Sequence, residues 1–161
     1  KYTNRASLSY NDTRLVGGGY NLSLNKATKN MYAINESTKS ALVYDATTMK
    51  LIREVKLPIN FSTGAKIFGS ASGLTGIDDS YKIYIYKNNT FGELQHTLAT
   101  NGNSVWNWTL TDNDKVIYSN YYGIYVVDAA TGNTIGEIPT KQTFAVSQDG
   151  KYLCAYHQNE Y

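Results

Sequence analysis

Two tryptophans and two tyrosines form the most unusual local pattern in this sequence. The stretch NSVWNWTL places Trp106 and Trp108 two residues apart, and Tyr121 and Tyr122 follow thirteen and fourteen residues after Trp108. Residues two apart on a β-strand share a face, which favours packing of both indole rings between neighbouring sheets. The alternative is an aromatic binding rim, in which Trp106, Trp108, Tyr121 and Tyr122 contact a ligand. The solvent exposure of the four rings distinguishes these interpretations.

No residue pattern in the sequence matches a catalytic or metal-binding motif. The histidines, His96 and His157, are far apart, and neither has a companion at ligand spacing. The segment GSASG has Ala71 where a nucleophile elbow requires serine. We therefore predict no catalytic residue, no metal and no cofactor, and we lean against an enzyme.

Acidic residues and the single cysteine have structural explanations. Asp112 and Asp114, in TDNDK, are expected to form a hairpin turn, because Asp and Asn tolerate left-handed backbone geometry. The pair Asp78-Asp79 has the same loop interpretation. The lone Cys154 excludes an internal disulfide, and in the apolar run KYLCAY it is expected to be a buried small residue.

The composition restricts the partners. The chain has 161 residues, is 42% hydrophobic, and carries 15 Lys and Arg against 13 Asp and Glu. A single domain with a real core is expected. The charges are scattered without a basic stripe, so nucleic acid is not an expected partner. No apolar run reaches the ~18 residues of a membrane span, so membrane insertion is not expected.

Strand–turn–strand segments recur at regular spacing. Val43–Val55 (VYDATTMKLIREV) and Val126–Ile138 (VVDAATGNTIGEI) align at an offset of 83 residues, with Asp45 matching Asp128. Ile83–Gln95 (IYIYKNNTFGELQ) lies midway between them. An active-site acid would be unique, whereas a turn acid recurs, so the repetition of Asp45 and Asp128 indicates a structural role.

A second motif predicts hairpins between these segments. Leu110–Asn120 (LTDNDKVIYSN) aligns with Val146–Tyr156 (VSQDGKYLCAY) at an offset of 36 residues, and similar patterns begin near Leu24 and Leu8. Each consists of a strand, a polar turn and a β-rich strand. No convincing 3.6-residue apolar periodicity occurs, so few or no helices are expected.

Together the two motifs predict an all-β fold made of β-propeller blades. Each blade is a four-stranded antiparallel meander with a period of about 41 to 42 residues, a length typical of propeller repeats. The alternating YKIYIY directs Ile to one face and Tyr to the other, so both faces need cover. A β-sandwich is the alternative. The predicted full blades span 21–58, 64–100 and 104–140, with partial ones at 1–20 and 143–161.

The blade pattern resembles a known family. NMYAIN followed by ALVYDATTMKLI resembles the surface-layer type of β-propeller repeat called YVTN, and IYVVDAATGNTIGEI repeats the pattern. The turn AATGN is also similar to quinoprotein-like propellers. The resemblance to WD repeats is weaker, because Tyr44-Asp45, Tyr86-Lys87 and Val127-Asp128 replace Trp-Asp. These motifs specify a fold and hardly a function.

The resemblance, the repeats and the missing catalytic pattern predict a non-enzymatic interaction scaffold that is secreted or at the cell surface and presents its loops to a protein or glycan partner. Two alternatives remain open: a quinoprotein-like or lactonase-like propeller whose site lies partly outside this chain, and an intracellular, cytoplasmic WD-type scaffold. About three full blades are too few for a closed ring. We therefore expect additional blades or a homo-oligomer to complete the ring, unless residues 6–19 pair with Tyr152–Tyr156.

Overall fold

The computed structural model describes residues 22–35, 37–61, 64–100, 102–139 and 143–155. These residues form β-strands and no helix, as predicted. The strands are β1 (Leu22–Asn25), β2 (Asn30–Asn35), β3 (Ser40–Asp45), β4 (Leu51–Lys56), β5 (Ile67–Gly69), β6 (Thr75–Asp78), β7 (Lys82–Tyr86), β8 (Leu94–Ala99), β9 (Asn107–Leu110), β10 (Lys115–Ser119), β11 (Ile124–Asp128), β12 (Thr134–Ile138), β13 (Phe144–Val146) and β14 (Leu153–Ala155). The partial blade predicted at 1–20 and the histidine at 157 lie outside the described residues.

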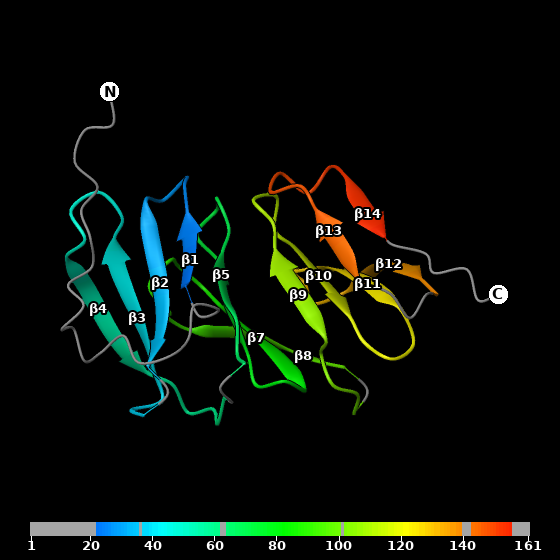
Figure 1. Ribbon diagram of the computed structural model, residues 1–161, viewed down its shortest axis with the longest axis horizontal. Coiled ribbons are helices and arrows are strands. Elements are labelled where there is room, and N and C mark those ends of the chain that lie inside the picture. The colour runs from blue at the N-terminus through cyan, green and yellow to red at the C-terminus, as the bar shows by residue number, and fades with distance from the viewer. Residues whose placement is uncertain (1–21, 36, 62–63, 101, 140–142, 156–161) are drawn as a thin grey trace.

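The strands form successive antiparallel meanders, which confirms the predicted fold class. The first sheet is β1–β4, the second β5–β8 and the third β9–β12, each with its strands paired in chain order. A fourth sheet consists of β13 and β14. In Figure 1 the first strand of each sheet lies innermost and the fourth outermost, so the sheets fan out as in a propeller. Among the described strands, no pairing closes the fan into a ring.

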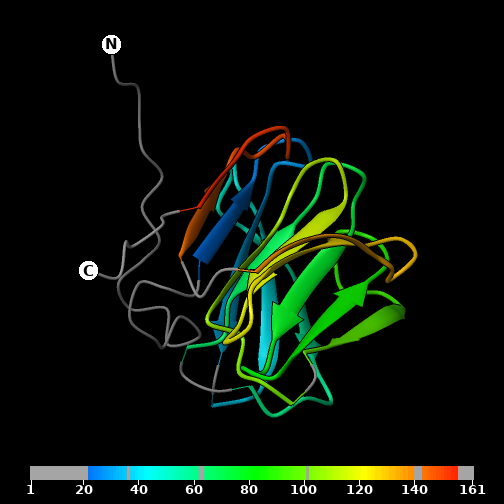
Figure 2. The same ribbon diagram turned by 90° about the vertical axis from the view of Figure 1, so that its right-hand side faces the viewer.

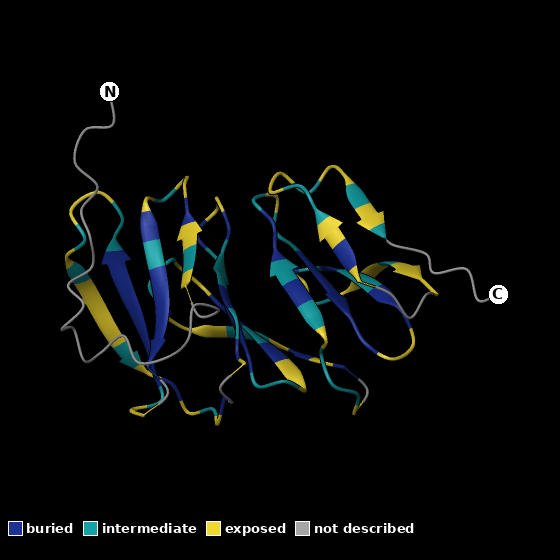
Figure 3. Ribbon diagram, in the orientation of Figure 1, coloured by how far each residue is buried: buried dark blue, intermediate teal, exposed yellow. Residues whose placement is uncertain are grey.

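The second sheet is buried on both faces. Ile83 and Ile85 of β7 are fully buried and pack against the third sheet. Tyr84 and Tyr86, which alternate with them, pack against the first sheet. The prediction that YKIYIY needs cover on both faces is confirmed. In Figure 3 the buried positions run through the middle strands, whereas the fourth strands at the rim are largely exposed.

Hydrophobic clusters and turns join each sheet to the next. An antiparallel meander places its first and third turns at one end, called here the turn end; Figure 2 shows the first turns gathered there. Neighbouring first turns are hydrogen-bonded through Asn25 Nδ2 to Ser70 O (2.7 Å), Ser72 Oγ to Asp114 Oδ1 (2.7 Å) and Asp112 N to Gln148 O (2.8 Å). The opposite end, called the connector end, carries the second turn of each four-stranded sheet and the segments 57–61, 64–66 and 102–106.

The expected burial of Cys154 is wrong, because its side chain is exposed. Cys154 lies in β14 between Leu153 and Ala155, which pack against the third sheet. Neighbouring residues of a strand point to opposite faces, so Cys154 points away from that contact. An apolar run in a sequence does not reveal that only one face of the strand is covered.

Gly76 of β6 has no room for a larger side chain. A Cβ there would lie 2.9 Å from Cη2 of Trp108 and 3.1 Å from Cδ1 of Ile85. We expect Gly76→Ala to lower the free energy of unfolding by about 1–3 kcal/mol, because overpacking would push the second and third sheets apart. Urea denaturation followed by circular dichroism measures the change.

Gly136 of β12 provides the matched control. A Cβ at this position would meet Val126 at 3.6 Å, an ordinary contact. Since glycine weakens strand interiors by roughly 0.5–1 kcal/mol relative to alanine, Gly136→Ala is expected to leave stability unchanged or to raise it. Equal destabilisation by the two substitutions would contradict tight packing at Gly76.

Candidate functional site: an aromatic patch and an inner pocket

Three of the four aromatic residues singled out in the sequence form one exposed surface. We define Trp106, Tyr121 and Tyr122 as the aromatic patch. Their exposed fractions are 51%, 49% and 59%. The rings of Trp106 and Tyr121 are 6.3 Å apart at 89°, and those of Tyr121 and Tyr122 are 5.4 Å apart at 86°. The patch therefore lies at the connector end as a continuous group of edge-to-face rings.

Backbone hydrogen bonds hold the patch in place. Tyr121 and Tyr122 lie in the turn between β10 and β11, where Asn120 Oδ1 accepts hydrogen bonds from the backbone N–H of Tyr122 at 2.9 Å and of Gly123 at 3.3 Å. Gly123 lets the chain pass close to β12, because a Cβ there would lie 2.6 Å from the carbonyl oxygen of Ile138. The backbone N–H of Trp106 bonds the carbonyl of Ser119 at 2.9 Å, so the three rings sit on a well-fixed backbone.

Trp108 is separated from the other three. It lies in β9 and is 2% exposed, whereas Trp106 precedes the strand. Its ring meets that of Phe68 edge to face, with centroids 4.8 Å apart, and it packs into the core between the second and third sheets. Spacing of two predicts a shared face only when both residues belong to the strand, and here Trp106 does not.

Asp78 forms a buried polar link that the sequence did not indicate. It ends β6 and is 4% exposed. Its Oδ1 accepts hydrogen bonds from Lys66 N at 2.6 Å and Trp108 Nε1 at 2.8 Å, and its Oδ2 accepts one from Ser80 N at 3.0 Å. The loop interpretation fits the neighbouring Asp79 and is wrong for Asp78, because Trp108 from the next sheet covers this carboxylate.

Burial shifts the pKa values of Asp78 and of the nearby Lys66. Desolvation raises the pKa of the Asp78 carboxyl above its usual value, although the donated hydrogen bonds oppose the shift. Burial likewise lowers the pKa of Lys66, whose Nζ donates to Asn107 Oδ1 at 2.6 Å. Because these polar atoms are bonded to groups of both sheets, the arrangement fastens the second sheet to the third.

The inner strands line an open pocket of about 210 Å³. Every sheet contributes to its wall, and none of the described lining residues is charged: they are Ser23, Leu24, Phe68, Gly69, Thr109, Leu110, Val146 and Gln148. At ~30 Å³ per liquid water, the volume corresponds to a small ligand. Hydroxyl and amide groups beside apolar walls suit an uncharged molecule with a few polar atoms.

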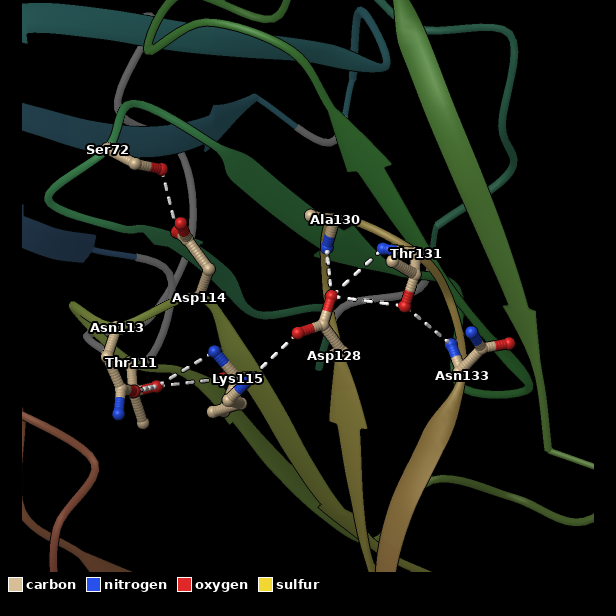
Figure 4. Close-up of polar contacts among 9 residues, drawn as sticks. All are labelled: Ser72, Thr111, Asn113, Asp114, Lys115, Asp128, Ala130, Thr131 and Asn133. Atoms are coloured by element: carbon tan, nitrogen blue, oxygen red, sulfur yellow. Dashed lines mark hydrogen bonds and ion pairs between the residues drawn. The ribbon is translucent and has the colours of Figure 1, made fainter.

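The recurring aspartates Asp45 and Asp128 share one turn structure. Oδ1 of Asp128 accepts hydrogen bonds from the backbone N–H of Ala130 at 3.1 Å and of Thr131 at 3.0 Å (Figure 4). Oδ1 of Asp45 does the same for residues 47 and 48, at 2.8 and 2.7 Å. Each aspartate thus closes the turn between the third and fourth strands, in agreement with a structural role. Asp112 and Asp114 also lie in a turn, as expected.

Asp128 makes stability depend on pH. Its Oδ2 accepts a hydrogen bond from Lys115 Nζ at 2.7 Å, and this contact, together with the Thr131 backbone N–H, lowers the pKa of Asp128 to about 2. A carboxyl whose pKa is lower in the folded state stabilises the fold above its unfolded pKa of about 3.9, and this contribution disappears as the pH falls. The relevant window therefore runs from about pH 4 down to 2.

We expect Asp128→Asn to lower the free energy of unfolding at pH 6 by at most about 1 kcal/mol, because the pair is partly exposed and screened by water. The difference between wild type and variant should shrink as the pH falls from 4 to 2, and 1 M NaCl should weaken it at pH 6. Urea denaturation across this pH range measures it. A difference that stays constant with pH would assign the effect to the turn instead of the charge.

The other residues with reactive or metal-binding side chains do not come together in a site within the described part of the chain. His96 Nε2 lies 2.7 Å from the carbonyl oxygen of Ala130, a contact between the second and third sheets. No group of three or more His, Cys, Asp or Glu residues in the described part of the chain is arranged to hold a metal ion. The described residues also contain no helix long and apolar enough to cross a membrane.

Comparisons with known proteins support the fold alone. No protein-family model matches this sequence, and no curated protein matches it. Among solved structures, hydrazine synthase from Kuenenia stuttgartiensis is similar, with a TM-score of 0.66 and 14% identity over 92% of this chain. This chain spans 45% of that chain. At such low identity, the similarity describes the arrangement of strands and does not transfer an activity.

Proposed function

We propose that this chain is part of a β-propeller of the YVTN type and serves as a non-enzymatic interaction scaffold. Its face-to-face meanders and the turn shared by Asp45 and Asp128 support the propeller assignment. The scaffold presents connector-end loops to a protein or glycan on an extracellular or cell-surface structure. Additional strands, from the rest of the protein or from a second copy, pair with β14 and complete the ring.

The observation that carries this function is the aromatic patch. Large aromatic side chains normally bury much of their area, and clustered exposed ones mark binding surfaces. Trp106, Tyr121 and Tyr122 are about half exposed, contact one another, and sit on hydrogen-bonded backbone. Such prearranged rings lose little conformational freedom on binding, which favours affinity.

Site-specific cross-linking tests the scaffold function. A photoreactive phenylalanine analogue at position 122 of the full-length protein, irradiated in its native surroundings, should attach to one defined macromolecule. The same analogue at position 81 is the control, since Tyr81 occupies the equivalent turn of the second sheet and is similarly exposed. Equal attachment at both positions, or none at 122, would contradict a partner site at the patch.

The inner pocket favours a second candidate, an enzyme or a cofactor-binding propeller. All four sheets line it, and its volume of about 210 Å³ admits a small molecule. Thermal denaturation of the full-length protein with a panel of cofactors and metal ions tests this alternative. A rise in melting temperature that Leu24→Trp abolishes by filling the pocket would favour ligand binding there over the scaffold.

A further inference from the structure

The aromatic patch is the largest cluster of exposed apolar rings in contact among the described residues. The exposed Ile52, Leu94 and Ile135 belong to the fourth strands of three different sheets, so they are separated around the rim. Tyr81 is exposed by 55% and contacts no other aromatic ring among the described residues. Single exposed apolar residues are ordinary, whereas a contiguous group needs an explanation.

The patch is small, and none of its three residues is acidic or basic. Three large aromatic residues that are about half exposed offer roughly 300 Å², given ~150–250 Å² for each ring when fully buried. A stable protein interface needs about 800 Å² per partner. The segments that form the patch, 102–108 and 119–124, contain no Asp, Glu, Lys or Arg, and Lys66 Nζ is hydrogen-bonded to Asn107 Oδ1 within the first of them. A compact, uncharged ligand therefore fits this surface better than a second protein.

The ring geometry suits a sugar. The edge-to-face contacts of Tyr121 with both neighbours give a stepped surface on which part of each ring meets water. The C–H face of a pyranose is apolar and matches an aromatic face in size, while its hydroxyls bond to polar groups at the edge. Tyrosine and tryptophan combine an apolar ring with a polar O–H or N–H, which serves both parts of such a ligand.

We propose that the aromatic patch binds neutral carbohydrate chains, with Trp106 and Tyr122 stacking against pyranose rings. This inference rests on the proposed scaffold function and specifies the ligand as a glycan. Tyr121 lies between the two, in contact with both rings, and acts as the residue that positions them.

Nuclear magnetic resonance tests the proposal with a built-in reference. The protein contains two tryptophans, and the indole N–H of Trp108 is buried and bonded to Asp78 whereas Trp106 is exposed. Titration of the 15N-labelled full chain with neutral hexasaccharides of glucose, mannose and N-acetylglucosamine should move the Trp106 indole signal saturably for at least one of them. The Trp108 signal should stay in place and also report an intact fold.

Substitutions in the aromatic patch test whether the carbohydrate binds at this surface. Trp106→Ala and Tyr122→Ala are each expected to weaken binding by at least about tenfold, in line with a lost anchor residue. Tyr81→Ala is the matched control. Its backbone N–H bonds Asp79 Oδ1 as that of Tyr122 bonds Asn120 Oδ1, and it is similarly exposed. This control should bind within twofold of wild type.

Two results would overturn the carbohydrate assignment. One is the absence of a saturable shift with every neutral hexasaccharide; the other is an equal loss of affinity in Tyr81→Ala. If cross-linking at position 122 still captures one defined protein, the scaffold function stands and only the ligand class is wrong. If position 122 captures nothing and no sugar binds, both proposals fail.

Discussion

Replacement of Asp78 with alanine is expected to lower the free energy of unfolding by about 3 kcal/mol, since the buried indole N–H of Trp108 left without a partner costs about 1–3 kcal/mol and two partly buried backbone N–H groups add to this loss. Three donors would lose their acceptor: the indole N–H of Trp108 and the backbone N–H groups of Lys66 and Ser80. The loss should appear as a lower urea midpoint for the cooperative unfolding of the domain.

The neighbouring Asp79 makes a stringent control for this experiment. It also accepts three hydrogen bonds, from the backbone N–H of Tyr81 and Lys82 and from Tyr84 Oη. Asp79 is only partly buried, so water can replace the lost acceptor and Asp79→Ala should cost under about 1 kcal/mol. Asp78→Asn, which keeps one oxygen and removes the buried charge, should fall between the two. Comparable losses for Asp78→Ala and Asp79→Ala would show that burial is not the cause.

Replacement of Phe91 with alanine is expected to cost about 3–5 kcal/mol, the range for deletion of a buried aromatic ring. Phe91 is 1% exposed although it lies in the turn between β7 and β8. Its ring meets those of Tyr32 at 6.2 Å and Tyr86 at 5.3 Å, so it fills the contact between the first and second sheets. Differential scanning calorimetry should record a lower melting temperature.

Met49, a turn residue of the first sheet, is the control that separates the stability contributed by the Phe91 ring from that of the turn backbone. Phe91 and Met49 both have left-handed φ angles, 55° and 58°, so an alanine at either position carries a similar backbone cost. Met49 is only partly buried, and Met49→Ala should cost about 1 kcal/mol or less. If the two substitutions cost the same, the ring of Phe91 does not fasten the sheets together.

The sequence predicted the repeated features of this molecule, namely the strands and the turns between them. Alternating strands and recurrent turn residues such as Asp45 and Asp128 act locally, so they appear in each copy and reveal the meander. In the middle copy, Lys87 replaces the aspartate and one more residue enters the turn, where Gly92 N bonds Lys87 O. The spacing between the copies therefore predicted the sheet even where the turn residue differed.

The parts of the site that the sequence did not predict depend on contacts between sheets. Asp78 resembles its neighbour Asp79 in the sequence, and only the approach of Trp108, thirty positions later, buries it. Trp106 and Trp108 differ in exposure because β9 begins between them. The inner pocket draws its walls from four separate strands. Features of this kind require the packed structure, since no local pattern encodes them.

The neighbour-to-neighbour packing of the sheets has a consequence for folding kinetics. Each of three hydrophobic clusters joins one sheet to the next along the chain, so these contacts link neighbouring repeats. Folding is expected to begin at one sheet and propagate to its neighbours, as in linear repeat proteins. Amide hydrogen exchange should accordingly be graded, with β14 opening first and β7, covered on both faces, exchanging last.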